Sequence, residues 1–251
     1  MHGNSPHGGS QPAVGRLRAV LIGRAVPYAR PGTLSAIDKR AVGDVAVDAG
    51  PQGLAGDEQG DRRVHGGPDK AVHCYAWQHY ASWRAELPAS ALLQQPGAFG
   101  ENFSVDGLEE ASVCVADQWR IGTATFEVSQ GRQPCWKLNE RFGVADMSSR
   151  VQDSLRAGWY LRVLSAGRIR AGDEIIRLAR PCPDWPLQRL LAAIRDRVCD
   201  AALLRDILEL PLPASWRALF RARLDNGRAE DWSKRLHGRA AGQATSGNPR
   251  S

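Results

Sequence analysis

Long apolar runs are absent from this sequence of 251 residues. No stretch approaches the ~18 apolar residues that a transmembrane helix needs, and the longest run, at residues 18–23, has the length of a strand. Residues 1–6 also lack the basic segment and apolar core that mark a secretory signal peptide. We therefore expect a cytoplasmic protein that does not associate with a membrane.

Cysteine is scarce, and its pattern excludes several kinds of site. The five cysteines are Cys74, Cys114, Cys135, Cys182 and Cys199. Their number is odd and their spacings are long, which argues against a disulfide framework. No two of them form a CxxC pair, so neither a tetrahedral zinc site nor an iron–sulfur cluster is indicated. A cysteine with a catalytic or metal-binding role in this chain would therefore have that role without a second cysteine.

Lysine is rare although the chain is basic. The formal net charge is +6, yet the only lysines are Lys39, Lys70, Lys137 and Lys234, and the other basic residues are almost all arginine. No block of five or more like charges occurs, and no nucleic-acid-binding motif is recognisable. The positive balance favours anionic small ligands such as phosphates rather than nucleic acid.

The composition that remains is that of a globular protein, with 43% apolar and 24% charged residues. Residues 1–15 and 238–251 are rich in small and polar residues and predict a flexible arm and a flexible tail. Residues 16–182 contain short apolar runs broken by Gly, Pro and Asp. Many short strands with glycine turns predict a mainly β fold built around a closed barrel.

Particular strands can be assigned from alternating apolar residues. They are residues 119–121, 125–128, 160–164, 168–170 and 173–178. The first two predict a hairpin through Gly122 and Thr123, the next two predict a second hairpin, and the last continues the sheet. Two helices are expected to interrupt the barrel, at residues 77–86, with Trp77, Tyr80, Ala81 and Arg84 on one stripe, and at residues 135–141.

The apolar period becomes helical after a proline-rich boundary at residues 181–186. Residues 183–237 therefore predict a small C-terminal domain of about three helices. About fifty residues are too few for an independent core, so this unit should pack on the barrel or on a second subunit. A homodimer through the helical unit is one such arrangement.

Glycines and basic residues gather in the segment from Gly53 to Val72. His65, Gly66, Gly67 and Lys70 stand close together there, where backbone N–H groups could approach an anion while cations flank it. This pattern suits a phosphate or a pterin-type ligand. The alternative is a glycine turn between strands, in which His65 is a packed or hydrogen-bonded histidine.

A second polar group follows at Glu101 and Asn102, next to Gly100. An amide beside a carboxylate can hydrogen-bond the edge of a heterocycle. The alternative is a strand entry with an Asx turn.

The segment whose residues are best suited to catalysis or metal binding surrounds Cys135. Pro134 suits the first turn of a helix and would place Cys135 near the helix N-terminus, with Arg132 and Lys137 beside it. Both features favour a thiolate, which can act as a nucleophile, a persulfide carrier or a soft metal ligand. The alternative is a buried structural cysteine, as we expect for the other four.

These segments, in this order, resemble the MOSC domains, named for the C-terminus of molybdenum cofactor sulfurase, and among them the bacterial YiiM group. The resembling pieces are GLAGDEQGDRRVHGGPDKAVHCY, PGAFGENFSVDGL, RQPCWKLN, GWYLRVLSAG and SWRALFRARLDNGRAEDWSKRLHGR. They span roughly residues 16–237. The sequence departs from the family where Gly131 precedes Arg132, because the family usually has proline there.

The resemblance implies a β-barrel with a three-helix C-terminal domain, in agreement with the strand and helix patterns. It also implies that the chain binds the molybdenum cofactor, a molybdopterin that carries one Mo, and that Cys135 ligates the metal and is catalytic. The expected cofactor-binding residues are His65, Gly66, Gly67, Lys70, Asn102, Arg132 and Lys137. Members of this group reduce N-hydroxylated compounds such as 6-hydroxylaminopurine to amines.

Two further expectations concern electrons and alternative functions. No flavin, dinucleotide or iron–sulfur motif is present, so an external electron-donor protein is expected. The same thiolate could instead carry a persulfide, or the protein could bind and store the cofactor without turnover. The Mo and pterin content of the purified protein separates these alternatives.

Overall fold

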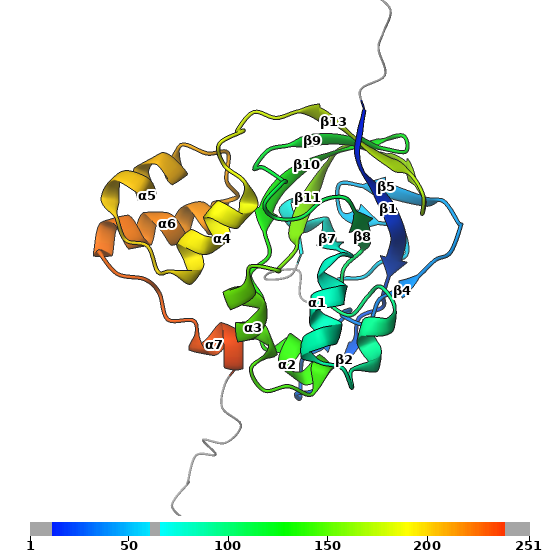
Figure 1. Ribbon diagram of the computed structural model, residues 1–251, viewed down its shortest axis with the longest axis horizontal. Coiled ribbons are helices and arrows are strands. Elements are labelled where there is room, and N and C mark those ends of the chain that lie inside the picture. Colours follow the sequence, from blue (N-terminus) through cyan, green and yellow to red (C-terminus); the bar gives the residue numbers. More distant parts are fainter. Residues whose placement is uncertain (1–11, 61–65, 239–251) are drawn as a thin grey trace, which may run out of the picture.

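A closed β-barrel forms the larger part of the molecule (Figure 1). The computed structural model describes residues 12–60 and 66–238. Around the barrel in this part of the chain run β13 (Glu174–Ala179), β9 (Gln118–Ile121), β10 (Ala124–Gly131), β11 (Trp159–Ser165), β7 (Val72–Ala76), β8 (Phe103–Asp106) and β1 (Ala13–Ile22). β13 pairs with both β9 and β1, which closes the sheet on itself. The prediction of a mainly β fold with a closed barrel is therefore confirmed.

β7 and β8 run parallel, with Cys74 opposite Phe103, whereas the other barrel pairs are antiparallel. Parallel neighbours need a crossover connection. Here it contains α1 (His79–Glu86) and the 3-10 turn η2 (Ala91–Gln94). The crossover returns through residues 97–102 to the end of the barrel where both strands begin.

Alternate residues of β10 fill the barrel interior. Ala124, Phe126 and Val128 are at most 1% exposed. Phe126 meets Phe103 of β8 edge to face, with ring centroids 5.8 Å apart. The barrel is thus a packed core, and its polar chemistry lies at one end.

The first expected hairpin is confirmed, because β9 and β10 pair antiparallel with Ile121 opposite Ala124. The second expected hairpin is wrong. β12 (Gly167–Ile169) leaves β11 and pairs with β5 (Val47–Gly50), with Ile169 opposite Val47. Both side chains are buried in that pairing, so a long-range apolar contact overrides the local turn. The remaining short strands are β2 (Val26–Pro27), β3 (Leu34–Ser35), β4 (Arg40–Ala41) and β6 (Gly53–Leu54).

β1 begins earlier than the expected arm at residues 1–15 allows. Ala13 pairs with Ile176 and Gly15 with Ile175 of β13, so the last residues of that arm belong to the barrel. The closure of the barrel supplies these hydrogen bonds, which the composition of the arm does not reveal. Residues 1–11 and 239–251 lie outside the described residues.

α1 begins at His79 and buries His79, Tyr80 and Trp83, whereas Ala81 is exposed. The expected stripe is therefore wrong by part of a turn. Trp83 decides the orientation of the helix, because its indole N–H donates to the Tyr75 hydroxyl at 2.7 Å inside the core.

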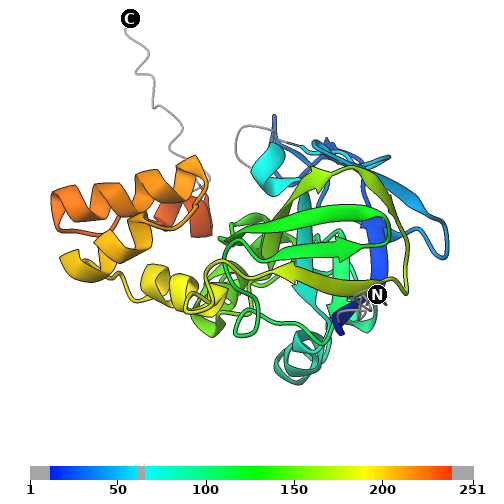
Figure 2. The same ribbon diagram turned by 90° about the horizontal axis from the view of Figure 1, so that it is seen from above.

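Two more helices, α2 (Lys137–Phe142) and α3 (Met147–Ser154), connect β10 to β11. The C-terminal helices α4 (Leu187–Arg195), α5 (Ala201–Leu208), α6 (Ala214–Asn226) and α7 (Ser233–His237) lie together on one side of the barrel (Figures 1 and 2). About three were expected by residue 237, and the structure has four within the described residues. The last strand ends at Ala179 and α4 begins at Leu187.

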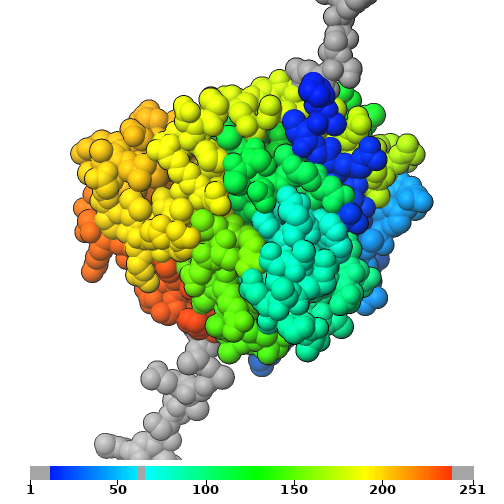
Figure 3. All heavy atoms as spheres, viewed as in Figure 1, coloured from blue at the N-terminus to red at the C-terminus, as the bar shows by residue number. Residues whose placement is uncertain are grey.

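The helical unit packs directly on the barrel, as Figure 3 shows for one face of the molecule. Leu191 of α4 lies over Gly131 at the end of β10, where an added Cβ would come within 2.9 Å of the leucine side chain. The Leu187 N–H donates to the Val113 carbonyl at 2.8 Å. The expectation that the unit packs on the barrel is met, while a homodimer stays a prediction. Within the described residues, no helix combines the length and apolarity needed to cross a membrane.

Candidate functional site

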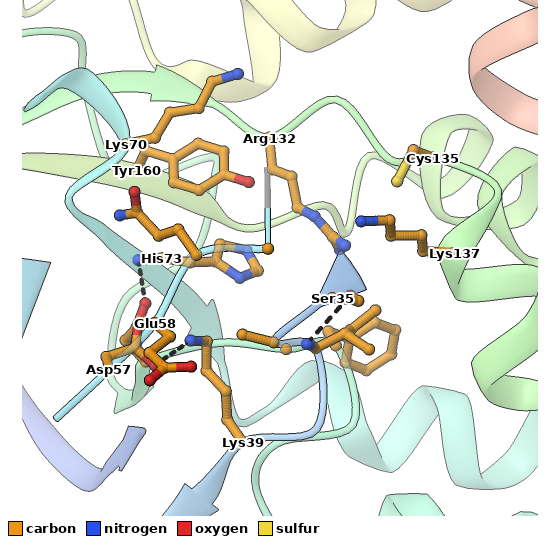
Figure 4. A pocket seen from close by; sticks show the side chains of 17 residues that line it. Ser35, Lys39, Asp57, Glu58, Lys70, His73, Arg132, Cys135, Lys137 and Tyr160 are labelled. Carbon is orange, nitrogen blue, oxygen red and sulfur yellow. Dashed lines mark hydrogen bonds and ion pairs between the residues drawn. The ribbon is translucent and has the colours of Figure 1, made fainter. Parts of the chain in front are cut away.

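A small cavity of about 90 Å³ lies at the end of the barrel where β10 ends and β7 and β8 begin (Figure 4). It is lined by Ser35, Ala36, Ile37, Lys39, Asp57, Glu58, Gln59, Gly60, Lys70, His73, Phe99, Gly100, Asn102, Arg132, Cys135, Lys137 and Tyr160. Typical ligand sites measure roughly 300–1,000 Å³. This cavity is therefore the size of one chemical group, such as a phosphate, rather than of a whole cofactor.

A larger cleft of about 890 Å³ adjoins the cavity and reaches the helical unit. It is lined by Gly32, Thr33, Leu34, Gly60, Lys70, Gln130, Gly131, Gln133, Cys135, Trp136, Lys137, Tyr160, Ser215, Trp216, Leu219, Asp231, Lys234 and Arg235. Cys135, Lys70, Lys137 and Tyr160 line both spaces, so Cys135 lies at their junction.

Arg132 is the central cation of the small cavity and is only 6% exposed. It follows β10 directly, and its backbone N–H donates to the Gly158 carbonyl at 2.9 Å. Figure 4 shows its guanidinium and the Lys137 amine pointing toward one another. Two buried cations that face each other repel at low dielectric. An anion between them would remove that cost.

The lysines add to the positive charge at this site. Lys39, Lys70 and Lys137 line the cavity, and Lys234 lines the cleft, so all four lysines of the chain lie at this site. Burial lowers the pKa of Lys70, and this effect is opposed by Cys135 and Asp69. Lys137 is 6% exposed, and its amine donates to the Leu34 carbonyl at 2.9 Å.

Three buried polar atoms of the cavity have no hydrogen-bond partner among the described residues: Gln59 Oε1, His73 Nε2 and Arg132 Nη1. His73 is 5% exposed, and its pKa lies well below the ordinary value, chiefly because of burial and secondly because of Arg132. The neutral ring can offer or accept a hydrogen bond, and the guanidinium can donate one. Buried polar atoms are normally satisfied, so these atoms indicate a ligand-binding wall.

This pKa shift predicts that the ligand-free protein is acid-labile. Folded His73 stays neutral, whereas unfolded His73 takes up a proton near its ordinary pKa of 6.5. The unfolded state then binds more protons, so the stability contribution is present above pH 6.5 and is lost below it, by up to about 1.4 kcal/mol per pH unit. Urea unfolding of wild type and His73→Gln at about pH 7 and pH 5.5 should show a smaller loss in the variant. Equal losses in both proteins would contradict this role for His73.

Asp57 anchors the opposite wall. It forms an ion pair with Lys39, with both side chains at most 8% exposed, and it accepts the Gly23 N–H and the Asn102 Nδ2 donor, each at 2.8 Å. Burial lowers the pKa of Lys39, an effect that Asp57 opposes. Asp57 therefore fixes the cavity wall rather than offering a free carboxylate to a ligand.

Asn102 lines the cavity as predicted, but its amide is already engaged by the chain. Its Oδ1 accepts the His73 N–H at 3.1 Å, and its Nδ2 also donates to the Leu21 carbonyl at 3.1 Å. Glu101 points elsewhere and accepts the N–H groups of Gly97 and Phe99 in a buried turn. These contacts hold the loop, and a cofactor-binding role for Asn102 stays a prediction.

Cys135 lies two residues before α2, so the prediction of a helix over residues 135–141 is wrong at its start. The Leu138 N–H donates to the Cys135 carbonyl at 3.0 Å, which makes a turn that leads into the helix. The side chain is half-buried and forms no disulfide with the other described cysteines. It offers one soft sulfur ligand to the cavity and the cleft.

The other predicted site residues lie in different places, and their cofactor-binding roles stay predictions. Lys70, Arg132 and Lys137 line the cavity with Cys135. Gly66 and Gly67 line neither space, although Gly67 has a φ of 92° that favours glycine. His65 lies outside the described residues.

The departure at Gly131 has a packing explanation. β10 continues through Gly131, which pairs with Trp159 of β11. Leu191 of α4 lies where a side chain on residue 131 would be. Gly131, the residue before Arg132, is thus held by its strand pairing and covered by the helical unit.

Sequence reasoning missed His73, Lys39 and Tyr160 in the cavity and Gln130, Trp136, Trp216 and Arg235 in the cleft. His73 and Gln130 lie within strands. The signal that the sequence offered for them was a polar residue among apolar neighbours. For Lys39, the signal was the rarity of lysine.

Family models match both parts of this architecture. The MOSC domain model matches residues 61–176, and the YiiM-like, 3-alpha helix domain model matches residues 185–227. Among curated proteins, Protein YiiM of Escherichia coli is 38% identical over 188 residues, which cover 74% of this chain and 84% of that protein. The barrel thus falls in the MOSC class of domains.

A solved structure and a second curated relative extend this comparison. The crystal structure of YiiM from Escherichia coli has a TM-score of 0.74 at 30% identity, covering 89% of this chain and 99% of that one. A protein of Gibberella moniliformis named Reductase is 36% identical over 214 residues, which are 85% of this chain but 38% of that protein. The chain belongs to the YiiM-like family of MOSC-domain proteins, which gives it a MOSC-type function.

Proposed function

We propose that the protein binds the molybdenum cofactor and reduces N-hydroxylated heteroaromatic compounds, such as 6-hydroxylaminopurine, to amines. The observation that carries this proposal is Cys135, a half-buried thiol at the junction of a cation-lined cavity and a large cleft. The relative named Reductase supports an oxidoreductase activity.

The residues present fit this cofactor. Cys135 supplies one soft ligand, which suits a metal that arrives with most of its ligands on an organic group. Arg132, Lys137 and Lys70 surround a space the size of a phosphate, and Arg132 Nη1 has no hydrogen-bond partner in the part of the chain that the structure describes. The pterin would extend from there into the cleft, where Tyr160 can donate a hydrogen bond because burial raises the pKa of its phenol.

The cleft is suited to a flat substrate. Trp136 and Trp216 contribute aromatic walls, and planar heterocycles stack favourably on such rings. Gln130 also lines the cleft, and its side-chain oxygen is buried without a hydrogen-bond partner among the residues described. An acceptor of this kind would recognise an N–H group on a base edge.

The reaction is R–NHOH + 2 e⁻ + 2 H⁺ → R–NH₂ + H₂O. When bound, the molybdenum cofactor supplies the two-electron reduction of the N–O bond. Cys135 would hold the metal, the cations would fix the phosphate, and the tryptophans would orient the substrate and exclude water. The cleft would admit the substrate and release the amine.

Electron supply gives the test of this function. The purified protein with its cofactor should reduce 6-hydroxylaminopurine when an artificial low-potential donor is present, and it should not do so with NADH or NADPH alone. The reason is that the sequence contains no GxGxxG motif after a strand and no cysteine cluster. A donor protein would then be the physiological partner.

Three outcomes distinguish the alternatives. Turnover with a pyridine nucleotide alone would contradict the external-donor proposal. Failure with every donor despite one Mo per chain would favour cofactor storage. Labile sulfane sulfur without Mo would favour a persulfide carrier on Cys135.

A further inference from the structure

The short C-terminal helix α7 lies beside α3 (Figure 1), and it is hydrogen-bonded to the segment that carries Cys135, about one hundred residues away in sequence. Arg235 Nη1 donates to the Pro134 carbonyl at 2.5 Å. The carbonyl of Arg235 itself accepts the Trp136 N–H at 2.8 Å. One residue of α7 therefore holds the neighbours on both sides of Cys135.

The Arg235 guanidinium is also fixed from a third direction. Its Nη2 donates to Gln152 Oε1 of α3 at 2.6 Å. Burial lowers the pKa of Arg235 to about 10, against the opposing effects of Cys135 and Glu230, so the group stays charged at neutral pH. Charge-assisted hydrogen bonds to carbonyls are among the stronger ones in proteins.

Neighbouring residues of α7 strengthen this docking. The Leu236 carbonyl accepts Asn139 Nδ2 and the Ser148 hydroxyl, each at 2.8 Å. The His237 carbonyl accepts Arg30 Nη2 at 3.1 Å. The otherwise unpaired carbonyls at the end of α7 are thereby used to attach it to α2, α3 and the β2–β3 loop.

The chain just before α7 is anchored in the core of the helical unit. Arg223, which is fully buried, forms two hydrogen bonds of 2.9 Å with Glu230 and one of 2.8 Å with the Ala193 carbonyl. Glu230 also accepts the Trp232 indole N–H at 2.6 Å. The Trp232 carbonyl in turn accepts the Arg235 N–H at 2.9 Å, so a series of hydrogen bonds leads from the core of the helical unit to Arg235.

We propose that Arg235 is a positioning residue that fixes the backbone on both sides of Cys135, and that the C-terminal helices support the site through it. The proposal rests on the function proposed above for Cys135. Residue 235 lies beyond the part matched by the three-helix family model, which ends at residue 227. The helical unit then contributes to the thiol's geometry as well as to the wall of the cleft.

Alkylation of Cys135 by iodoacetamide in the cofactor-free protein provides the test, with each cysteine followed by peptide mass spectrometry. In Arg235→Ala the alkylation rate of Cys135, relative to that of Cys182, should rise about tenfold or more. The reason is that losing a charge-assisted hydrogen bond shifts the equilibrium between the held and the released cysteine segment by about that factor. Arg235→Lys keeps the charge but cannot form the same fork, so its rise should be smaller. Cofactor retention should fall most in Arg235→Ala and less in Arg235→Lys.

Arg217→Ala is the matched control. Arg217 also donates two hydrogen bonds to carbonyls, those of Leu208 and Leu210, within the helical unit. It should destabilise the helices without changing the rate at Cys135. If Arg235→Ala is unfolded by circular dichroism, Arg235→Lys decides the result.

Two results separate this proposal from the proposed function. An unchanged Cys135 rate in a folded Arg235 variant overturns the positioning role, even if Cys135→Ser loses the cofactor. A raised rate together with full cofactor retention in Cys135→Ser would leave the positioning contact standing and overturn the cofactor role of Cys135.

Discussion

Replacing Cys135 by serine should abolish molybdenum retention and hydroxylamine reduction while leaving the fold intact. A hydroxyl is a hard, weakly acidic ligand and a poor substitute for a soft thiolate. The side chain is half-buried and lies at the junction of cavity and cleft, so the change of one atom should cost little stability. Metal analysis, pterin fluorescence and the artificial-donor assay measure the effect.

Cys182 and Cys199 are the matched controls, because both are half-buried like Cys135 but line neither space. Their serine variants should retain molybdenum and activity. Cys74 and Cys114 are buried, and burial raises the pKa of both thiols, which keeps them protonated. Serine at those two positions should preserve activity in whatever fraction folds. Wild-type turnover in Cys135→Ser would show that the thiol has no part in the reaction.

The parts of the fold that the sequence predicts are those with local signals. The hairpin of β9 and β10 follows from period-two alternation around Gly122, and the helical spacing after residue 186 predicts α4 to α6. The second hairpin could not be found this way. Its turn residues are typical, but Ile169 is buried against Val47, more than one hundred residues earlier.

The candidate site illustrates the same limit. The segments around Lys70, Arg132 and Lys137 could be grouped because a resemblance connects them. His73 is part of a strand, and what makes it notable is the burial of its ring beside Arg132, which only the packed structure reveals. Arg235 has no local signal, because its contacts join the last helix to the loop before α2.

The rarity of lysine in the sequence points to the position of the site. All four side chains line the cavity or the cleft, whereas the exposed Arg24, Arg40 and Arg120 line neither space. Lysine and arginine are not interchangeable, because an ammonium is a compact charge that reaches an anion from any direction. The distribution is what a site for a phosphate-bearing ligand would produce.

The Arg132→Met variant should change cofactor affinity and the stability of the cofactor-free protein in opposite directions. Arg132 is 6% exposed and faces Lys137, and its Nη1 has no hydrogen-bond partner within residues 12–60 and 66–238. A charged hydrogen bond to a phosphate stabilises by about 1.5–3 kcal/mol, so its loss should weaken cofactor binding by about ten- to a hundredfold. Turnover of the fraction that still holds cofactor should change little, because the contact is the same in ground and transition states.

The cofactor-free variant, in contrast, should unfold at the same temperature as wild type or a higher one. Methionine keeps the side-chain volume and removes a buried charge that faces another cation, and an uncompensated buried charge is costly to the folded state. Arg120→Met is the control, because Arg120 is an exposed residue of β9 and lines neither space. Calorimetry of both cofactor-free variants and the Mo content after dialysis measure the two effects. Lower stability with full Mo content in Arg132→Met would make Arg132 a structural residue of the barrel rather than part of a site held ready for an anion.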